Sequence, residues 1–240
     1  GVQTCALPIS VLKQSLEPFG LTLDEGAWEK MVRFQAFLLE KNRQMDLTNV
    51  PEADMPVRHY ADSLLPLKWE LFPPGCRVID VGSGAGFPGL PLAIAREDMK
   101  VTLLESMQKR CDFLHEAVTL LALPNVTVVT GRAEEKGQGP LREQFDLALA
   151  RAVAGLPVLA EYLLPFVRVG GRALCWKGPA VHEETPAGQM ASQILGGRMG
   201  ELIDLNIPGR SHYIQVLDKV AATPRQYPRK AGTPGRKPLA

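Results

Sequence analysis

The chain has 240 residues, enough for one α/β domain with an appended segment or for two small domains, and a core of that size needs no disulfides. With 45% hydrophobic residues, 22% charged residues and no long apolar run, the composition is that of a globular protein and argues against a membrane-spanning one. The cysteines are scattered and no metal-binding spacing occurs, so neither a metal site nor a redox dithiol is predicted; they are Cys5, Cys76, Cys111 and Cys175.

The first nine residues follow neither a helical nor a strand pattern, and we leave them out of the fold prediction because they resemble a cloning or annotation artefact. They contain no basic segment followed by an apolar one, so no signal peptide is predicted. Reduced cysteines and a cytoplasmic location are therefore expected.

Charge is distributed unevenly along the chain. The net charge is only +1, but six bases and no acid lie between Lys219 and Ala240, so that segment carries +6 and the remainder −5. A basic, proline-rich tail at residues 221–240 favours contact with a polyanion, although a solvated tail explains the composition equally well.

Residues 10–74 are predicted to form an N-terminal helical cap. Apolar residues recur at helical spacing across Ala27–Leu39, and Asp24 is placed to cap that helix. A further helix is predicted over His59–Trp69, and the Pro-Pro-Gly sequence after Phe72 ends the segment. We expect this cap to pack on the domain that follows it.

From residue 75 to residue 220, short apolar runs alternate with amphipathic segments, which predicts a parallel sheet covered by helices on both faces. The predicted parallel strands are Arg77–Val81, Val101–Glu105, Val126–Thr130, Phe145–Ala150 and Arg172–Trp176. The predicted helices between and after them are Leu90–Arg96, Lys109–Leu121, Leu156–Phe166 and Val181–Leu195.

The last two apolar runs, Glu201–Ile207 and His212–Val220, are joined by the short connection Pro208–Ser211. Such a connection makes an antiparallel pair. A Rossmann-like, seven-stranded sheet that ends in an antiparallel hairpin is the arrangement of the class I S-adenosylmethionine-dependent methyltransferases. A dinucleotide-dependent dehydrogenase would keep its last strands parallel, so that class is disfavoured.

The strongest local signal is a glycine-rich turn between a buried strand and a helix, Asp80–Gly89. Glycines let a backbone approach a ligand closely, and a helix N-terminus presents unpaired N–H groups. Phe87 stands where a dinucleotide fingerprint would have its third glycine. The sequence Asp-x-Gly-x-Gly-x-Gly instead resembles motif I of the methyltransferases, whose turn holds the methionyl and ribose parts of the cofactor.

Polar residues follow the other predicted strands where they end. Glu105 alone is more simply a surface acid, but at this distance from the glycine turn a carboxylate that binds both ribose hydroxyls is favoured. Gly131–Glu134 follow the third strand, where this fold holds the adenine ring. Arg151 ends the fourth strand, at the edge of the sheet where ligands bind in open α/β folds.

Absent motifs narrow the reaction. Ala150–Ala152 stand where an amino-directed methyltransferase has an Asn/Asp-Pro-Pro-Tyr/Phe motif, and no Pro-Cys or Thr-Cys pair offers a nucleophile for pyrimidine C5 methylation. The favoured target is an atom that is already nucleophilic, such as N7 of guanine, which has a lone pair and no proton to lose. Its methylation depends mainly on alignment with the sulfonium methyl group.

Several segments together resemble one family, the bacterial small-subunit ribosomal RNA methyltransferase G, also called glucose-inhibited division protein B. The most distinctive are Arg-His-x-x-Asp-Ser at residues 58–63 and Tyr-Pro-Arg-Lys-x-Gly-Thr-Pro at residues 227–234, and the resemblance covers about residues 10–240. Asp46 departs from the family's asparagine. The other matching segments are Asn42–Asn49, Asp80–Ile94, Lys109–Arg110, Arg132–Glu134, Arg151–Ala154 and Trp176–Gly178.

The resemblance implies methyl transfer from S-adenosylmethionine to N7 of a guanine in 16S ribosomal RNA, with small-subunit ribosomal RNA or the 30S subunit as the partner. A monomer is expected. The residues assigned to the cofactor are Asp80, Gly82, Gly84, Gly86, Phe87, Glu105, Ala133, Glu134 and Arg151. The residues assigned to positioning the base or its phosphate are Arg58, His59, Arg151 and Lys177.

Three further expectations concern the substrate. The cap residues Arg58 to Ser63 are expected to face the target base, although a packed or capping role is equally good for His59. Lys177 is expected at the sheet edge, near a phosphate or the guanine O6. The tail is expected to follow an RNA backbone with Tyr227 stacked on a base, so its truncation would weaken RNA binding and spare cofactor binding.

Two alternatives remain open. One is a small-molecule or protein methyltransferase on the same fold, because fold does not determine substrate. The other is a cofactor-binding ribosome-assembly factor without catalysis. The basic tail and the cap motifs favour RNA over the first alternative, and the intact glycine turn with Glu105 favours an enzyme over the second.

Overall fold

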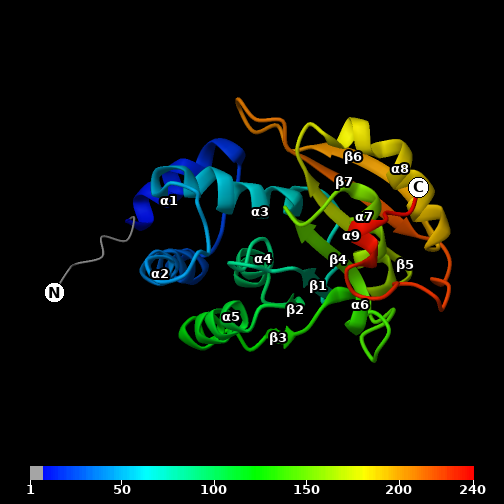
Figure 1. Ribbon diagram of the computed structural model, residues 1–240. Coiled ribbons are helices and arrows are strands. Elements are labelled where there is room, and N and C mark those ends of the chain that lie inside the picture. The colour runs from blue at the N-terminus through cyan, green and yellow to red at the C-terminus, as the bar shows by residue number, and fades with distance from the viewer. Residues whose placement is uncertain (1–7) are drawn as a thin grey trace.

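The computed structural model describes residues 8–240, which are built around one seven-stranded sheet (Figure 1). The strand order is β3-β2-β1-β4-β5-β7-β6; β1 to β5 are parallel, and β7 runs antiparallel to β5 and β6. The sheet is therefore the one predicted, with a terminal antiparallel hairpin. The strands are β1 (Arg77–Val81), β2 (Lys100–Glu105), β3 (Val126–Thr130), β4 (Phe145–Arg151), β5 (Val167–Lys177), β6 (Gly197–Asp204) and β7 (Tyr213–Lys219).

Helices cover both faces of the sheet and enclose two hydrophobic cores. One core joins α4 (Gly89–Ala95) and α5 (Gln108–Leu120) to the N-terminal helices, and the other lies under α7 (Leu156–Leu163) and α8 (Val181–Ile194). Neighbouring residues of β1 enter different cores because successive side chains of a strand point to opposite faces. Both faces of the central strands are thus buried, as in other parallel sheets.

The N-terminal helices form the cap that the sequence predicts. The side chain of Asp24 accepts a hydrogen bond from the N–H of Ala27 at 2.8 Å and begins the longest helix. The predicted helix His59–Trp69 is instead a series of short turns, since Pro56 and Pro66 lack the N–H that a regular helix needs. The cap elements are α1 (Ile9–Leu16), η1 (Glu17–Phe19), α2 (Glu25–Asn42), η2 (Glu52–Asp54), the π-helical η3 (Pro56–Ala61), α3 (Asp62–Leu64) and η4 (Leu65–Lys68).

Aromatic side chains attach the cap to the glycine-rich turn. The ring of Phe87 lies 5.3 Å from that of Phe34 and 5.6 Å from that of Tyr60, and Phe37 stacks on Phe113 of α5 at 5.3 Å. Such pairs stabilise a core beyond the area they bury. The cap therefore shares one core with the turn that follows β1, and each holds the other in place.

The hairpin strands differ from their predicted bounds. β6 begins at Gly197 rather than Glu201, and a register shift lies between Met199 and Leu202. Such a bulge breaks the alternation of apolar and polar residues on which strand prediction depends. Three short elements, η5 (Leu164–Phe166), α6 (Ala133–Lys136) and α9 (Thr233–Arg236), complete the fold. The last two are too short to show helical periodicity.

The C-terminal segment packs against the rest of the molecule, and Figure 1 shows it beside α6 and α7. Arg229 forms a 2.6 Å ion pair with Glu161 of α7, whose side chain is only 1% exposed. The N–H of Gly232 donates to a carboxylate oxygen of Glu134 at 2.8 Å. The buried ammonium of Lys219 donates to the carbonyl oxygen of Leu164 at 2.6 Å.

Two of the six bases counted in the tail are therefore used inside the protein. The other four side chains are exposed: Arg225, Lys230, Arg236 and Lys237.

No helix among residues 8–240 has the length and apolarity needed to cross a membrane. Within the same residues, no group of three or more His, Cys, Asp or Glu is arranged to hold a metal ion. Cys76, Cys111 and Cys175 are buried free thiols. Cys5 lies outside the described residues, as does most of the stretch left out of the fold prediction.

The Arg229–Glu161 pair predicts a large loss of stability when one partner is removed. We expect Arg229→Met to lower the free energy of unfolding by about 3 kcal/mol, because it leaves a buried carboxylate unpaired. Arg198 is a matched control, since its pair with Asp218 has the arginine side chain 70% exposed. Arg198→Met should cost no more than about 0.5 kcal/mol in the same urea titration. Equal losses in the two variants would contradict this account.

Candidate active site at the carboxyl edge of the sheet

Two hollows lie side by side at the edge where the parallel strands end. We call the first, of about 180 Å³, the inner groove; Val81, Gly82, Leu104, Ser106, Gly131, Arg132, Ala133, Glu134, Val153 and Tyr162 line it. We call the second, of about 520 Å³, the basic cleft; Asp46, Leu47, Thr48, Asn49, Val50, Arg58, His59, Asp62, Arg110, Arg151, Ala152, Trp176, Lys177, Gly178, Arg210 and His212 line it. Cap residues contribute to the basic cleft but not to the inner groove.

The glycine-rich turn has the backbone conformation that its sequence predicts. Gly82, Gly84 and Gly86 have φ values of +73°, +56° and +95°, which side chains disfavour. A Cβ atom at Gly86 would lie 2.5 Å from a methyl carbon of Leu90, so the turn also packs too closely for any larger residue. Of the three glycines, Gly82 lines the inner groove and can present its backbone to a ligand there.

Asp80 ties the end of β1 to the beginning of α4. One of its carboxyl oxygens, Oδ2, accepts the N–H of Gly89 at 3.0 Å, and the other has no hydrogen-bond partner among residues 8–240. Burial raises the pKa of Asp80 to about 7, and the Gly89 N–H and the positive charge of Arg151 oppose the shift. The turn thus contains one buried carboxyl group with an unused acceptor oxygen.

Glu105 lies between Leu104 and Ser106, both of which line the inner groove, and three backbone N–H groups hold its carboxylate. Oε2 accepts the N–H of Gly84 at 2.9 Å, and Oε1 accepts those of Ser106 and Met107 at 2.8 and 2.9 Å. Each carboxylate oxygen has two acceptor positions, so Oε1 has none left and Oε2 has one for a hydroxyl hydrogen. The carboxylate is therefore able to accept a ribose hydroxyl through Oε2.

The remaining residues assigned to the cofactor separate into two groups. Ala133 and Glu134 line the inner groove at the beginning of α6, and Glu134 is held there by the N–H of Gly232. Phe87 instead turns its ring toward the cap, where it stacks on His59 with a centroid distance of 4.2 Å. Its ring is buried in the cap interface, so only its backbone is placed to meet a ligand at the turn.

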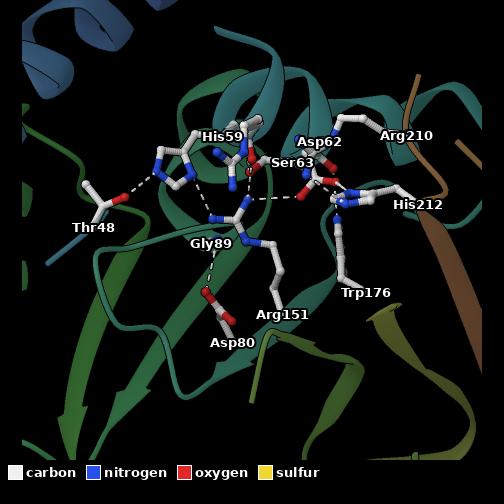
Figure 2. Close-up of polar contacts among 11 residues, drawn as sticks. Thr48, His59, Asp62, Ser63, Asp80, Gly89, Arg151, Trp176, Arg210 and His212 are labelled. Atoms are coloured by element: carbon white, nitrogen blue, oxygen red, sulfur yellow. Dashed lines mark hydrogen bonds and ion pairs between the residues drawn. The ribbon is translucent and has the colours of Figure 1, made fainter. Parts of the chain in front are cut away.

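His59 is a packed, neutral histidine in the wall of the basic cleft (Figure 2). Its Nδ1 lies 2.9 Å from Nη2 of Arg151, and its Nε2 lies 2.9 Å from Oγ1 of Thr48. An arginine can only donate, so the ring proton resides on Nε2 and is donated to Thr48. Burial, and then the charge of Arg151, lower the pKa of His59 to about 3.

Arg151 and Asp62 form the centre of a hydrogen-bond network that Figure 2 shows. Nη1 of Arg151 donates to Oδ2 of Asp62 at 2.9 Å, and Nδ1 of His212 lies 2.8 Å from the other carboxylate oxygen. Nε1 of Trp176 donates to the backbone oxygen of Asp62 at 2.8 Å. Arg210 reaches Nε2 of His212 at 3.0 Å. The network therefore joins the cap, β4, β5 and the β6–β7 connection.

The other residues assigned to base or phosphate positioning occupy different surroundings. Arg58 lines the basic cleft and lies 3.8 Å from Asp54, a weak ion pair. Lys177 also lines the cleft, but its ammonium is paired with Glu184 at 2.7 Å and donates to the carbonyl oxygen of Ala154 at 3.1 Å. Ser63 is fully buried, donates to its own turn and does not line the cleft.

Sequence reasoning did not assign Thr48, Arg110, Arg210 or His212 to the site, although all four line the basic cleft. Topology offers a signal for the last two. The first residue of β7 pairs with Lys177 at the end of β5, so the connection before β7 returns to the edge where ligands bind. The predicted antiparallel hairpin therefore already placed Arg210 and His212 near the edge where ligands bind.

One short segment, Arg151–Val153, borders both hollows, and we call it the dividing segment. Arg151 and Ala152 line the basic cleft, and Val153 lines the inner groove. Ala152 has a φ of +55°, and a methyl carbon of Val153 lies 3.0 Å from where a Cβ of Gly82 would be. The two hollows therefore share a wall at this segment.

The raised pKa of Asp80 predicts a pH-dependent difference between wild type and Asp80→Asn. An unfolded aspartate loses its proton near pH 4, whereas the folded one keeps it until about pH 7. The folded state binds more protons in that window, so wild-type stability falls there as pH rises, and asparagine escapes this loss. Between pH 5 and pH 8, the free energy of unfolding measured with urea should fall by about 2 kcal/mol more in the wild type than in Asp80→Asn. Parallel pH profiles would refute the shift.

Comparison with known proteins assigns the family. The family model for rRNA small subunit methyltransferase G, GidB, matches residues 27–210. The chain is 44% identical to the ribosomal RNA small subunit methyltransferase G of Leuconostoc mesenteroides, over 95% of this chain and 97% of the relative. It is 42% identical to the protein of the same name from Alkaliphilus metalliredigens, over 95% and 98%.

Solved structures agree with the fold. A predicted O-methyltransferase from Agrobacterium tumefaciens gives a TM-score of 0.52 at 22% identity, over 67% of this chain and 81% of that one. A variant of MtNAS solved with S-adenosylmethionine gives 0.54 at 18% identity, over 90% and 86%. The class I methyltransferase fold is thereby confirmed. With its family model, its near-full-length relatives and its fold in agreement, the chain belongs to the rRNA small subunit methyltransferase G family, as its motifs predict.

Proposed function

We propose that this protein transfers a methyl group from S-adenosylmethionine to N7 of a guanine in small-subunit ribosomal RNA. The observation that carries the proposal is the adjacency of the two hollows. The inner groove has the features of a cofactor site, the basic cleft has those of an RNA site, and the dividing segment borders both. Family membership supports the same enzyme class.

The residues of the inner groove fit the cofactor. When bound, S-adenosylmethionine supplies an electrophilic methyl group on a sulfonium sulfur. Glu105 would accept a ribose hydroxyl through Oε2, because backbone N–H groups already orient its carboxylate and leave one acceptor position on that oxygen. The turn at Gly82 would hold the methionyl part, and Ala133 with Glu134 would border the adenine. These assignments rest on the geometry of the residues and on the family resemblance.

The charge of the basic cleft fits RNA. Arg58, Arg110, Arg151, Arg210 and Lys177 contribute five cationic side chains. Two lining carboxylates, those of Asp46 and Asp62, and two neighbouring ones, those of Glu184 and Asp54, offset them in part. Arginine and lysine in such numbers favour a phosphate backbone.

The chemistry of the cleft fits N7 as the methyl acceptor. His59 and His212, the two histidines that line the cleft, each have both ring nitrogens engaged by protein groups. Neither is placed to remove a proton from a substrate. N7 of guanine has no proton to lose, so its methylation needs alignment rather than a general base.

The C-terminal segment can contribute to RNA binding only in part. Four of its basic side chains are exposed, whereas Lys219 and Arg229 are engaged inside the protein. Deleting the segment would also remove the group that holds Glu134. We therefore assign RNA contact to the four exposed bases and a supporting role at the inner groove to the rest. Cytoplasmic location, a monomeric state and the 30S subunit as substrate form part of the proposal.

A radiolabelled methyl-transfer assay tests the proposal. Purified protein is incubated with labelled cofactor and small subunits from cells that lack this activity, and the RNA is digested to nucleosides. We expect label in 7-methylguanosine at a single small-subunit position. Cofactor binding without label in any RNA would refute the proposal. It would favour a small-molecule or protein substrate, or an assembly factor without catalysis.

Arg110 provides a direct test of the basic cleft as the RNA site, because it enters the cleft from α5. We expect Arg110→Gln to weaken RNA binding several-fold and to reduce the salt slope of binding by about one, the loss of one phosphate contact. Cofactor affinity should not change. Lys100→Gln removes a charge at the opposite edge of the sheet, at the beginning of β2, and is the matched control. Equal effects of both substitutions on RNA affinity would exclude a specific role for the cleft.

A further inference from the structure

We infer that Asp62 and His212 are positioning residues that, with Arg210, hold Arg151 and thereby set the dividing segment between the inner groove and the basic cleft. The inference rests on the proposed function and deepens it. It assigns Asp62 of the cap and His212 of the β6–β7 connection to the alignment of methyl donor and acceptor. The β6–β7 connection is then part of the site.

Asp62 is the point at which the network converges. Its carboxylate is buried, with a side-chain exposure of 2%, and its two oxygens are used by Arg151 and His212. Trp176 holds its backbone oxygen from β5. A buried carboxylate is stable only when it is paired and hydrogen-bonded. These partners therefore fix the position of Asp62, and Asp62 fixes the positions of its partners.

The hydrogen bonds around His212 have one consistent direction. Arg210 can only donate, so its Nη2 donates to Nε2 of His212. The ring proton is then on Nδ1, from which it is donated to Asp62. A neutral ring in a single tautomer therefore connects Arg210, in the wall of the basic cleft, to the partner of Arg151. Nε of Arg210 is buried and has no hydrogen-bond partner among residues 8–240.

The dividing segment needs such support because its backbone is strained. Ala152 adopts a left-handed conformation, which costs a residue with a Cβ atom about 1 kcal/mol. On one side Arg151 is anchored to Asp62 and to the backbone oxygen of Arg58 at 3.1 Å. On the other side Lys177 donates to the carbonyl oxygen of Ala154. Releasing Arg151 would let the segment relax and displace the boundary that a transferred methyl group crosses.

The test compares His212→Ala with His212→Asn, whose side-chain amide can still donate to Asp62. His182→Ala is the matched control, since His182 lies on α8 and contacts Tyr213 outside the network. We expect His212→Ala to lower kcat by about tenfold to a hundredfold, as small misplacements of reacting groups do. The Kd of the cofactor should stay within about twofold of the wild-type value, because the residues proposed to contact the cofactor are unchanged. His212→Asn should recover most of the rate, and His182→Ala should match wild type.

Hydrogen exchange of the amides from Ala152 to Gly155 gives a second readout that does not require activity. We expect faster exchange there in His212→Ala only. If wild-type protein methylates no RNA, the proposed function has failed, and this exchange pattern alone decides the positioning role. Unchanged kcat and exchange in His212→Ala would overturn the inference. Failure of His212→Asn to recover the rate would also overturn it. Parallel losses of kcat, cofactor affinity and Tm in His212→Ala would overturn it as well, because they indicate a merely structural residue.

Discussion

The candidate site depends most on the ion pair between Arg151 and Asp62. Arg151 comes from the end of a parallel strand and Asp62 from the cap, so the pair joins the cofactor-binding fold to the segment packed on it. The guanidinium also contacts His59 and lies 5.3 Å from the ring of Phe87. Because Phe87 belongs to the glycine-rich turn, a single, partly buried charge pair links the turn, the cap and the basic cleft. The dividing segment begins at the same arginine.

Sequence patterns predicted those parts of the fold that local physics determines. β1 begins and ends where its apolar run does, because a strand buried on both faces shows as a nearly continuous apolar run. β3 also has its predicted bounds, although it is an edge strand in which only Val126 is buried. The Asp24 cap and the glycine-rich turn follow from side-chain and backbone geometry within a few residues. The site residues that lie at strand ends, such as Glu105 and Arg151, were predictable for the same reason: parallel strands end at one edge.

Contacts between distant segments were not predictable in this way. Asp62 and His212 are 150 residues apart, and neither has a neighbouring residue that signals the other. Composition assigned six free bases to the tail, but Lys219 is buried among backbone carbonyls and Arg229 pairs with Glu161. Likewise, the predicted contact of Lys177 with RNA did not anticipate Glu184 beside its ammonium. Charge counts show how many bases a segment has, and only the fold shows which of them remain free.

We propose that the inner groove and the basic cleft form one site that meets at Arg151–Val153. A crystal structure of the protein with S-adenosylhomocysteine, the demethylated form of the proposed cofactor, would decide this. We expect a ribose hydroxyl on Oε2 of Glu105, adenine beside Ala133 and the thioether sulfur at the dividing segment, open toward the basic cleft. A ligand whose sulfur faces away from that cleft, or which binds outside the inner groove, would show that the two hollows do not form one site.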